Sequence, residues 1–417
     1  MRIDRLKLEN FRCFEHMELE LHPEMTVLVG GNGAGKTAVV EGLTVAMEAV
    51  PRALDFSVAG ITRADLRRTR VDREGQIQIE IAQPTTVQAA GSFAGQKCEW
   101  ARGRKGPTGR TDRGQSTSFV KQIREALLSD VAGSAWPVLA AYGTDRLQGE
   151  VGPTRTGTAL YARTAAYEDC FRPIDSFTRQ MRWIRHQTYA DVQVGAPSQH
   201  VSAVLSAVMD CLPEVAQLAY SIRAEELLVV FKDGRLVSFD LLSDGYKGIL
   251  ALVADVAWRC VVLNSHLAAS APQLTAGVIV IDEIDLHLHP VWQRRVLADL
   301  RRTFPKIQFI VTTHSPQVLA SCQPEWVRVV DATGRIQLVD YVHGWDSNSI
   351  LRDIMGDQER PSFALALVEK VTAAIHAQDW SAADESIAKL EKELGPDDPE
   401  LTRARLDLSF EREVGGA

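Results

Sequence analysis

The segment GGNGAGKT, residues 30–37, decides how this chain of 417 residues is interpreted. It fits the phosphate-binding pattern G-x-x-x-x-G-K-[ST]. The segment follows an apolar run at 25–29, suited to a buried strand, and precedes residues 37–50, which carry apolar side chains at helical spacing. Glycines let backbone N–H groups turn toward an anion, and the start of the next helix adds partial positive charge. Strand, loop and helix together predict a nucleotide site.

Two side chains of this loop have expected roles in binding ATP. Lys36 is expected to reach the β- and γ-phosphates, and the hydroxyl of Thr37 is expected to be a ligand of Mg²⁺. A glycine-rich turn with an incidental lysine is the structural alternative, and the strand–loop–helix context argues against it. The other residues expected to contact the nucleotide are Gly30, Asn32, Gly33, Ala34, Gly35 and Ala38.

A second cluster of polar residues follows two further apolar runs. Residues 278–281 lead directly into the carboxylates Asp282 and Glu283, and residues 308–312 lead into His314. Parallel sheets bind ligands at the carboxyl ends of their strands, so Asp282 is expected beside Mg²⁺ and Glu283 is expected to polarise the attacking water. His314 is expected to contact the γ-phosphate. The structural alternatives are a solvated acidic turn and a histidine that only supports the strand end.

Ser243 and Gly245 begin a long apolar helix that extends to about residue 263. A helix start of this kind also binds anions. Within one chain such a site is redundant with Lys36, but it becomes necessary if Ser243 closes over a nucleotide held by a second copy. The alternatives are therefore a plain N-cap serine and a homodimer with composite ATP sites.

Composition narrows the class of protein. The 46 basic and 54 acidic side chains give a net charge of −8, and 45% of residues are hydrophobic. No run reaches the roughly 18 apolar residues of a membrane span, and the N-terminus is too charged for a signal peptide. The six scattered cysteines indicate a reducing compartment. We therefore expect a cytoplasmic globular protein without membrane contact.

The motifs occur in the order of the ABC-type ATPases, which the chain resembles over residues 1 to about 320. Within that class it is similar to the soluble branch of structural-maintenance-of-chromosomes, Rad50, RecF and overcoming-lysogenization-defect proteins, and the opening LENFRCF at 8–14 is typical of this branch. The other motifs that carry the resemblance are GGNGAGKT (30–37), LSDGYK (242–247), VIVIDE (278–283), DLHLHP (285–290) and TTHS (312–315).

The resemblance assigns a role to each motif. It implies that 36–37 form Walker A, that 282–283 form Walker B with its catalytic glutamate, that Ser243 and Gly245 belong to the signature, and that His314 is the switch histidine. Residues 287–289 lie where the family has its D-loop, with His289 where an aspartate is more usual. No Q-loop glutamine is evident, although residues 142–146 lie in a plausible place.

The fold class implied is α/β: an ABC-type ATPase head with a mixed central sheet that carries the P-loop, an antiparallel β subdomain, a compact helical insertion and a helical C-terminal tail. Lys36 and Ser243 lie 207 positions apart without sustained heptads, which excludes a long coiled-coil arm. The predicted domains are an N-terminal ATPase lobe (1–149), a helical insertion or lid (150–222), a C-terminal ATPase lobe (223–340) and a helical tail (341–417) that is a candidate partner-docking region.

Shorter segments give more local predictions. Alternation at 76–81 predicts an outer strand, and residues 101–114 predict a basic glycine-rich loop, either solvated or in contact with nucleic acid. Residues 150–220 read as mainly helical, and their arginines and aromatic residues form either a helical core with a polar face or a lid or DNA surface. Residues 381–384 resemble a capping box that begins a helix.

The tail carries a narrower resemblance. WDSNSILRDIM (345–355), Arg360-Pro361 and LGPDDPE (394–400) are similar to ATPase subunits of Septu-type antiphage systems, and related subunits accompany certain retrons. This resemblance implies an HNH-type nuclease partner encoded by a neighbouring gene. A helical cap that only covers the edge of the domain is the alternative. After His314 the chain has no clustered acidic motif and no Cys/His set of its own for nuclease chemistry.

The favoured hypothesis is an ATP-hydrolysing sensor or regulatory subunit of a bacterial antiphage defence complex that controls a separate HNH-type nuclease. Two copies would hold two ATP·Mg²⁺ head to tail, and assembly beyond a dimer and direct contact with nucleic acid are left open. The second hypothesis is a RecF-like repair or replication ATPase that binds DNA directly. The third is a binding module in which nucleotide occupancy, and not turnover, is the signal.

Overall fold

Four fully buried strands lie side by side in a six-stranded sheet, here called the central sheet, whose order is β15-β14-β3-β13-β12-β8. Neighbouring strands are parallel except for β15, which pairs antiparallel with β14. Burial on both faces explains why these four strands are mostly apolar. The predicted mixed central sheet is therefore confirmed. Its strands are β3 (Met25–Val29), β8 (Val138–Tyr142), β12 (Gly277–Ile281), β13 (Ile307–Thr312), β14 (Val327–Val330) and β15 (Ile336–Leu338).

The computed structural model describes residues 1–73, 76–112, 116–129, 134–145, 162–171, 176–195 and 198–415. The chain divides into two compact units, Met1–Ile350 and Leu351–Ala417. The first unit contains the central sheet and every motif from the P-loop to His314. Among the described residues, no helix is both long enough and apolar enough to cross a lipid bilayer.

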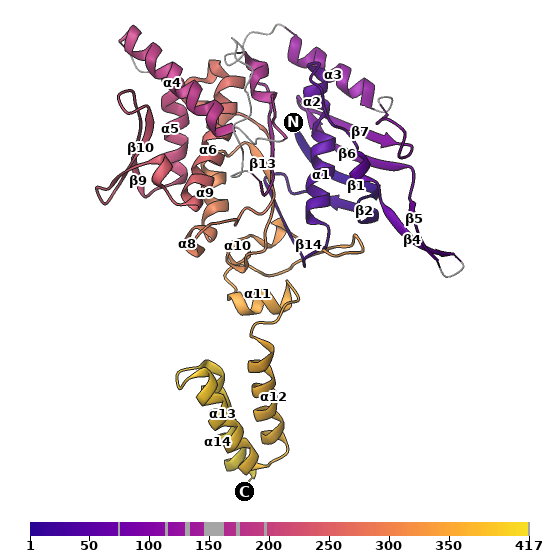
Figure 1. Ribbon diagram of the computed structural model, residues 1–417, viewed down its shortest axis with the longest axis vertical. Coiled ribbons are helices and arrows are strands. Elements are labelled where there is room, and N and C mark those ends of the chain that lie inside the picture. Colours follow the sequence, from indigo (N-terminus) through magenta and orange to yellow (C-terminus); the bar gives the residue numbers. More distant parts are fainter. Residues whose placement is uncertain are drawn as a thin grey trace. The chain divides into compact units, whose positions relative to one another are not determined.

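A four-stranded antiparallel sheet, of order β2-β1-β6-β7, covers one side of the P-loop helix. Side chains of β6 are alternately buried and partly exposed, so this sheet has one core face. Helix α1 (Lys36–Met47) contacts β1, β6 and β7 of this sheet and also β8 and β12 of the central sheet (Figure 1). The predicted antiparallel subdomain is confirmed. Its strands are β1 (Arg2–Phe11), β2 (Phe14–Glu20), β6 (Thr85–Phe93) and β7 (Gln96–Arg104).

The prediction of a loop over 101–114 is wrong for its first part, because residues 101–104 are the end of β7. Nine consecutive cross-strand pairs with β6 stabilise this strand despite its glycine and arginine content. Arg102 is buried and pairs with Glu48, and Arg104 donates to three backbone carbonyls. Two of the five cationic side chains therefore support the fold, and Arg113 lies outside the described residues.

Strands β4 (Arg68–Arg73) and β5 (Gln76–Ile81) pair with each other as a separate hairpin. Ile77 is 60% exposed and Ile79 is 67% exposed. The alternating sequence therefore predicted a strand on the outside of the molecule correctly, although its apolar face is not covered by the described part of this chain.

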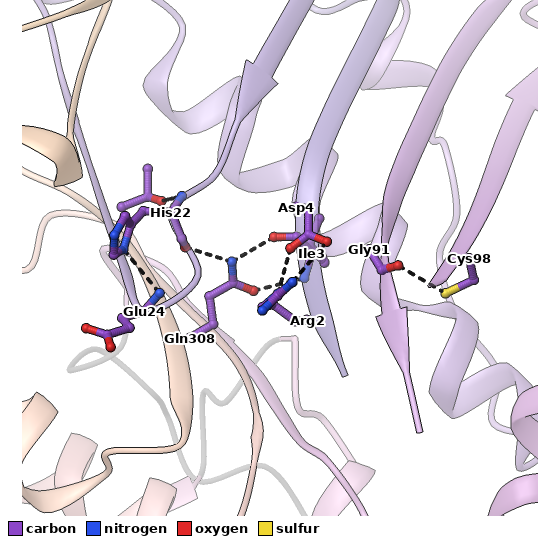
Figure 2. A network of polar contacts seen from close by, with 9 residues as sticks. Arg2, Ile3, Asp4, His22, Glu24, Gly91, Cys98 and Gln308 are labelled. Carbon is purple, nitrogen blue, oxygen red and sulfur yellow. Dashed lines mark hydrogen bonds and ion pairs between the residues drawn. The ribbon is translucent and has the colours of Figure 1, made fainter. Parts of the chain in front are cut away.

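The buried side chain of Gln308 joins the two sheets of the first unit (Figure 2). Its Nε2 donates to the carbonyl of Ile3 at 2.7 Å and to that of His22 at 3.0 Å. The N–H of Ile3 in turn donates to its Oε1 at 2.9 Å. Both polar atoms of the amide are thus satisfied, as buried polar groups require, and β1 is held against the start of β13.

A helical layer lies on the other side of the central sheet from α1 (Figure 1). Helix α6 contacts α4, α5 and β8, and it is almost entirely buried from Ile249 onward because it is apolar around its whole circumference. The helices of this layer are η4 (Arg163–Tyr167), α4 (Ser176–Val194), α5 (Gln199–Cys211), α6 (Asp244–Leu263) and α9 (Val296–Thr303).

The prediction that residues 150–220 are mainly helical needs one correction, because Val215–Ser221 forms strand β9. It pairs antiparallel with β10 (Glu226–Phe231), which also pairs with β11 (Leu236–Ser238) across a turn that contains Asp233 and Gly234. The predicted boundary at 222 thus falls between two paired strands. Pairing with β10 stabilises Val215–Ser221 as a strand. Residues 150–161, 172–175 and 196–197 of the predicted insertion lie outside the described residues.

Two arginines of this layer support the core, whereas Arg182 and Arg185 are exposed. Arg163 donates to the carbonyls of Leu263 and Ser134, Arg179 binds Asp169, and Trp183 is buried. The remaining short elements are η1 (Arg63–Asp65), α2 (Ala49–Ala53), α3 (Thr117–Leu128), η5 (Phe239–Leu241), η6 (Ser265–Ser270), α7 (Ala271–Leu274), α8 (Pro290–Gln293), α10 (Pro316–Ala320), η7 (Pro324–Trp326) and α11 (Ser347–Asp353).

The second unit is a three-helix bundle of α12 (Ser362–His376), α13 (Trp380–Leu394) and α14 (Pro399–Gly415). The expected capping box is wrong, because the side chain of Asp379, and not that of Ser381, accepts the N–H of Ala382 at the start of α13. Gly395 ends α13 with a φ of +91°, as predicted from its position. The core of the bundle consists of Val371, Ile375, Ala383, Ile387, Leu390, Leu401 and Leu408.

Candidate functional site

The P-loop connects β3 to α1, and two of its glycines are required by close approaches. A Cβ at Gly30 would lie 2.2 Å from the carbonyl oxygen of Val330. A Cβ at Gly35 would lie 2.3 Å from Cζ of Phe14, and the φ of Gly35 is +96°. The loop is thus pressed against β14 on one side and the β1–β2 turn on the other, which fixes the direction of its backbone.

We expect Gly35→Ala to lower the free energy of unfolding by about 2–4 kcal/mol, because a left-handed residue and an overpacked Cβ coincide there. Gly31→Ala is the matched control in the same loop. Gly31 has no atom within 4 Å of its added Cβ and does not have a positive φ. Denaturant unfolding of both variants without nucleotide measures the difference, and equal stabilities would contradict the packing described for Gly35.

Lys36 is 7% exposed and folds back over the loop. Its Nζ donates to the carbonyl of Gly30 at 2.8 Å and to that of Gly31 at 3.2 Å. Burial lowers the pKa of the Lys36 ammonium, and the nearby carboxylates Asp282, Glu283 and Asp285 oppose that shift. The cation is therefore held at the mouth of the loop, close to three acidic residues from the other cluster.

Hydrogen bonds join the P-loop helix to the ends of two neighbouring strands. The Thr37 hydroxyl donates to Oδ2 of Asp282 at 3.1 Å. The hydroxyl of Thr312 donates to Oδ1 of Asp282 at 2.5 Å and accepts the N–H of Glu283 at 2.7 Å. Because β3, β13 and β12 are adjacent and parallel, their carboxyl ends meet at one edge of the sheet. The structure thus brings the two predicted metal ligands together.

These oxygen atoms suit a small hard cation. Mg²⁺ prefers oxygen ligands and usually binds to proteins through one or two side chains, with phosphate and water completing its shell. A hydroxyl and a carboxylate side by side at Thr37 and Asp282 match that requirement. Within the described part of the chain, no group of three or more His, Cys, Asp or Glu side chains could hold a metal by itself. A cation at this site would therefore need the phosphates of a nucleotide.

The segment after β12 holds the predicted catalytic residues in defined positions. Glu283 is half-buried and has a φ of +50°, a strained value for this residue type. The carboxylate of Asp285 accepts the hydroxyl of Thr313 at 2.6 Å and the N–H of His314 at 3.4 Å. The chain on both sides of the predicted site is thus fixed by hydrogen bonds between the ends of β12 and β13.

The predicted D-loop (287–289) lies close to the predicted signature residue Gly245 of the same chain. His289 accepts the N–H of Val291 through Nδ1 and so caps α8, the role an aspartate would have there. A Cβ at Gly245 would lie 2.4 Å from the carbonyl oxygen of His287, so the start of α6 lies close to this loop. Ser243 is exposed and makes no capping hydrogen bond.

The structure does not bring the predicted signature to the P-loop of the same chain. In the part that the structure describes, no hydrogen bond connects Ser243 or Gly245 with residues 30–38. Walker A, Walker B and the segment of His314 therefore form one cluster, and the signature lies beside the D-loop as a second.

Three residues of the site escaped the sequence analysis. Thr312 and Asp285 lie inside the motifs TTHS and DLHLHP, but the predicted roles in this region belong to His314, Asp282 and Glu283. Tyr142 ends the apolar run of β8, and its carbonyl accepts the N–H of Asp282 at 2.8 Å. Only the pairing of β8, β12 and β13 reveals these contacts, although a hydroxyl directly at a strand end was a usable signal. Arg146, in the proposed Q-loop position, lies outside the described residues.

Two family models match this chain. One, described as "AAA domain", matches residues 5–143. The other, described as "AAA domain, putative AbiEii toxin, Type IV TA system", matches residues 172–320. The first match includes residues 30–37 and the second includes residues 278–315, and both bear out the classification of the chain as an ATPase.

The most similar proteins include two retron ATPases and a Septu protein. The Retron Ec83 probable ATPase of Escherichia coli is 30% identical over 60% of this chain and 46% of its own length. The Retron Vc95 probable ATPase of Vibrio cholerae is 45% identical over 25% of this chain and 20% of its own length. The Septu protein PtuA of Bacillus thuringiensis is 27% identical over 42% of this chain and 46% of its own length.

The aligned part of the chain spans less than half the length of each of these relatives. Shorter matches, over 10–11% of the chain, extend to Rad50, structural-maintenance-of-chromosomes and RecF proteins. The predicted resemblance to Septu and retron ATPases and to the Rad50, structural-maintenance-of-chromosomes and RecF branch is thereby confirmed.

Proposed function

We propose, on the premise that this chain belongs with the retron and Septu ATPases of the Rad50 and RecF branch, that it binds and hydrolyses ATP as the regulatory subunit of an antiphage defence complex. The observation that carries the ATPase part is the junction of Thr37, Asp282 and Thr312, with Glu283 held beside it. This junction supplies what phosphoryl transfer needs from a protein, which is positioned charge and a positioned carboxylate.

ATP would bind with its phosphates on the backbone of residues 30–38. Lys36 would exchange its two carbonyl contacts for the β- and γ-phosphates, a gain because hydrogen bonds between charged groups are the stronger kind. Thr37 and Asp282 would hold Mg²⁺, which neutralises charge on the phosphates when it is bound. Glu283 would orient and deprotonate the attacking water, and His314 would contact the γ-phosphate from the end of β13.

The exposed signature supports a homodimer. Ser243 has a free hydroxyl at the start of a 20-residue helix, and this helix start is not bonded to the P-loop of its own chain. We propose that Ser243 and Gly245 of one copy complete the ATP site of the other, with assembly beyond a dimer as a further step. Hydrolysis would then open the pair, because the γ-phosphate links the two copies.

The defence role rests on the relatives and not on the site. The partner we propose is an HNH-type nuclease from a neighbouring gene, which the nucleotide state of this subunit would control. All six cysteines are unpaired, which fits our placement of the complex in the cytoplasm. Steady DNA-stimulated hydrolysis by the chain alone would instead favour a RecF-like protein.

We expect Lys36→Ala to weaken ATP binding by about 10- to 100-fold, because a charged hydrogen bond to phosphate is worth roughly 1.5–3 kcal/mol. The matched control is Lys306→Ala, which removes an exposed lysine. Titration with ATP and Mg²⁺ in a calorimeter measures both affinities. If the Lys36 variant bound ATP as tightly as the control, the proposed phosphate site would be wrong.

A further inference from the structure

Nearly all of the net charge of the chain lies in its second unit. Residues 351–417 contain 8 basic and 15 acidic side chains, a net charge of −7. Residues 1–350 contain 38 basic and 39 acidic side chains, a net charge of −1. Charges of one sign within a bundle of this size repel each other and destabilise it. The excess of acidic residues therefore calls for an explanation other than stability.

The bundle has a groove between α12 and α14, with a volume of about 560 Å³. Its lining includes the core residues Val371 and Ile375 from α12 and the small Ala404 from α14. Phe410 also lines the groove and is 64% exposed. An apolar floor that reaches the core, with an exposed aromatic ring beside it, is the form of a helix-binding groove.

The groove is lined by more acidic than basic side chains, since Glu400, Asp407 and Glu411 stand against Arg403. Asp407 and Glu411 line it from α14, and both are exposed. Neither makes an ion pair with a described residue. The arginines of the bundle other than Arg403 and Arg352 pair outside the groove: Arg360 with Asp398, Arg405 with Glu391 and Arg412 with Asp384. The uncompensated negative charge is therefore concentrated beside the apolar floor.

The dimensions of the groove also limit what it can hold. Its lining on α14 extends from Glu400 to Glu411, which corresponds to about 16 Å along a helix axis. A helix of about three turns fits that length, and it would present apolar residues at i, i+3 or i+4, and i+7 to the floor. Lysine or arginine side chains on its flanks would meet Asp407 and Glu411.

We infer that this groove is the docking site for a basic amphipathic helix of the partner nuclease subunit. The inference rests on the proposed function for the existence of that partner. The first unit of a second copy is a poorer occupant, because its net charge of −1 offers no complementarity. Contacts at the rim act mainly on association rate and salt dependence, and the apolar floor acts mainly on dissociation.

The experiment uses the full chain and the product of its neighbouring gene, whose complex is measured by native mass spectrometry and by titration. The charge variant is Asp407→Lys/Glu411→Lys, and the apolar variant is Phe410→Ala. The matched control is Glu393→Lys/Asp397→Lys, which makes the same change in charge at two exposed acidic residues outside the groove. All four substituted carboxylates lie on the surface, so each variant should fold.

We expect the charge variant and Phe410→Ala each to weaken the complex by at least about tenfold, with the control within about twofold of wild type. ATP turnover by the chain alone should be the same in all of them. A complex that survives both groove variants overturns the inference while the partnership stands. If wild type forms no complex, the partnership and the docking site both fail, although the ATPase does not. A change in self-association caused by the groove variants would show that a second copy fills the groove.

Discussion

A Glu283→Gln protein is expected to bind ATP with unchanged affinity and to turn it over at least about 100-fold more slowly, because a positioned general base contributes about 10²- to 10⁴-fold. The amide has the size and shape of the carboxylate but cannot take a proton from water. The backbone N–H of residue 283 donates to Thr312, and this contact does not involve the substituted side chain. The geometry of the site should therefore persist while the basic group is lost.

The same variant should also trap the dimer. If opening requires hydrolysis, copies that bind ATP but do not cleave it will stay together. Phosphate release at saturating ATP measures turnover, and mass photometry with and without ATP measures the dimer fraction. Glu369→Gln is the matched control, since Glu369 is an exposed carboxylate of the second unit.

The outcomes of this pair of measurements separate the assignments. Unchanged turnover in Glu283→Gln would show that another group activates the water. Reduced turnover without any dimer would keep the catalytic role and remove the composite site. Full biological output from the non-hydrolysing variant would favour the binding module, in which occupancy alone is the signal.

Arg259→Met is expected to lower the free energy of unfolding by about 3–5 kcal/mol, the usual cost of leaving one member of a buried ion pair without its partner. Arg259 and Asp255 lie one turn apart on α6, with side chains that are 0% and 1% exposed and a separation of 2.8 Å. Burial alone would lower the pKa of Arg259, but Asp255, Tyr142 and Cys170 together raise that pKa above its usual value.

The cost is large because Asp255 belongs to a buried hydrogen-bond network. Its carboxylate also accepts the hydroxyl of Tyr142 at 2.6 Å and the amide of Gln180 at 2.7 Å. Arg259 donates to the carbonyl of Ala166 as well. Removal of the guanidinium would leave a carboxylate in the core with two neutral donors only.

Two variants test this explanation by denaturant unfolding. Arg185→Met breaks an exposed pair with Glu225, whose side chains are 52% and 59% exposed, and should cost less than about 1 kcal/mol. The double variant Asp255→Asn/Arg259→Met should recover part of the loss, because no charge is then buried. If Arg259→Met were as stable as Arg185→Met, the buried pair would not stabilise the fold.

This network reaches the proposed site through one residue. The hydroxyl of Tyr142 binds Asp255 on α6, and its carbonyl accepts the N–H of Asp282. Helix α6, which begins at the proposed signature, is therefore connected through β8 to Asp282, the proposed Walker B aspartate. We expect variants of the pair that remain folded to lower turnover as well.

The parts of the fold that were predicted correctly have strong local patterns. A local pattern of at most about 20 residues is enough to predict the apolar strands β3, β12 and β13, the P-loop and the apolar helix α6. Strands β6 and β7 could not be recognised in this way, because their alanine, glycine and glutamine residues become a strand only through pairing with β1 and with each other. Strand β9 was missed for the same reason.

The site shows the same division between local and non-local information. Lys36, Asp282 and Glu283 lie in motifs that state their chemistry directly. The role of Thr312 depends on Asp282, which is 30 positions away, and that of Tyr142 on Asp255, which is 113 positions away. Such contacts follow from sheet order and register, which apolar strands do not encode individually.

Gln308 affects the register in which β13 pairs with β12. Strands β12 and β13 are apolar on both faces, so a slip of one strand along the other would bury nearly the same hydrophobic surface. The amide of Gln308 meets Ile3 and His22 only in the observed pairing, in which it lies opposite Val278. Any slip would leave that buried amide without hydrogen-bond partners, at a cost of about 1–3 kcal/mol for each unpaired group. A single glutamine at one end of β13 thus disfavours incorrect registers. The register that it favours places Thr312 beside Asp282 at the other end of the strand.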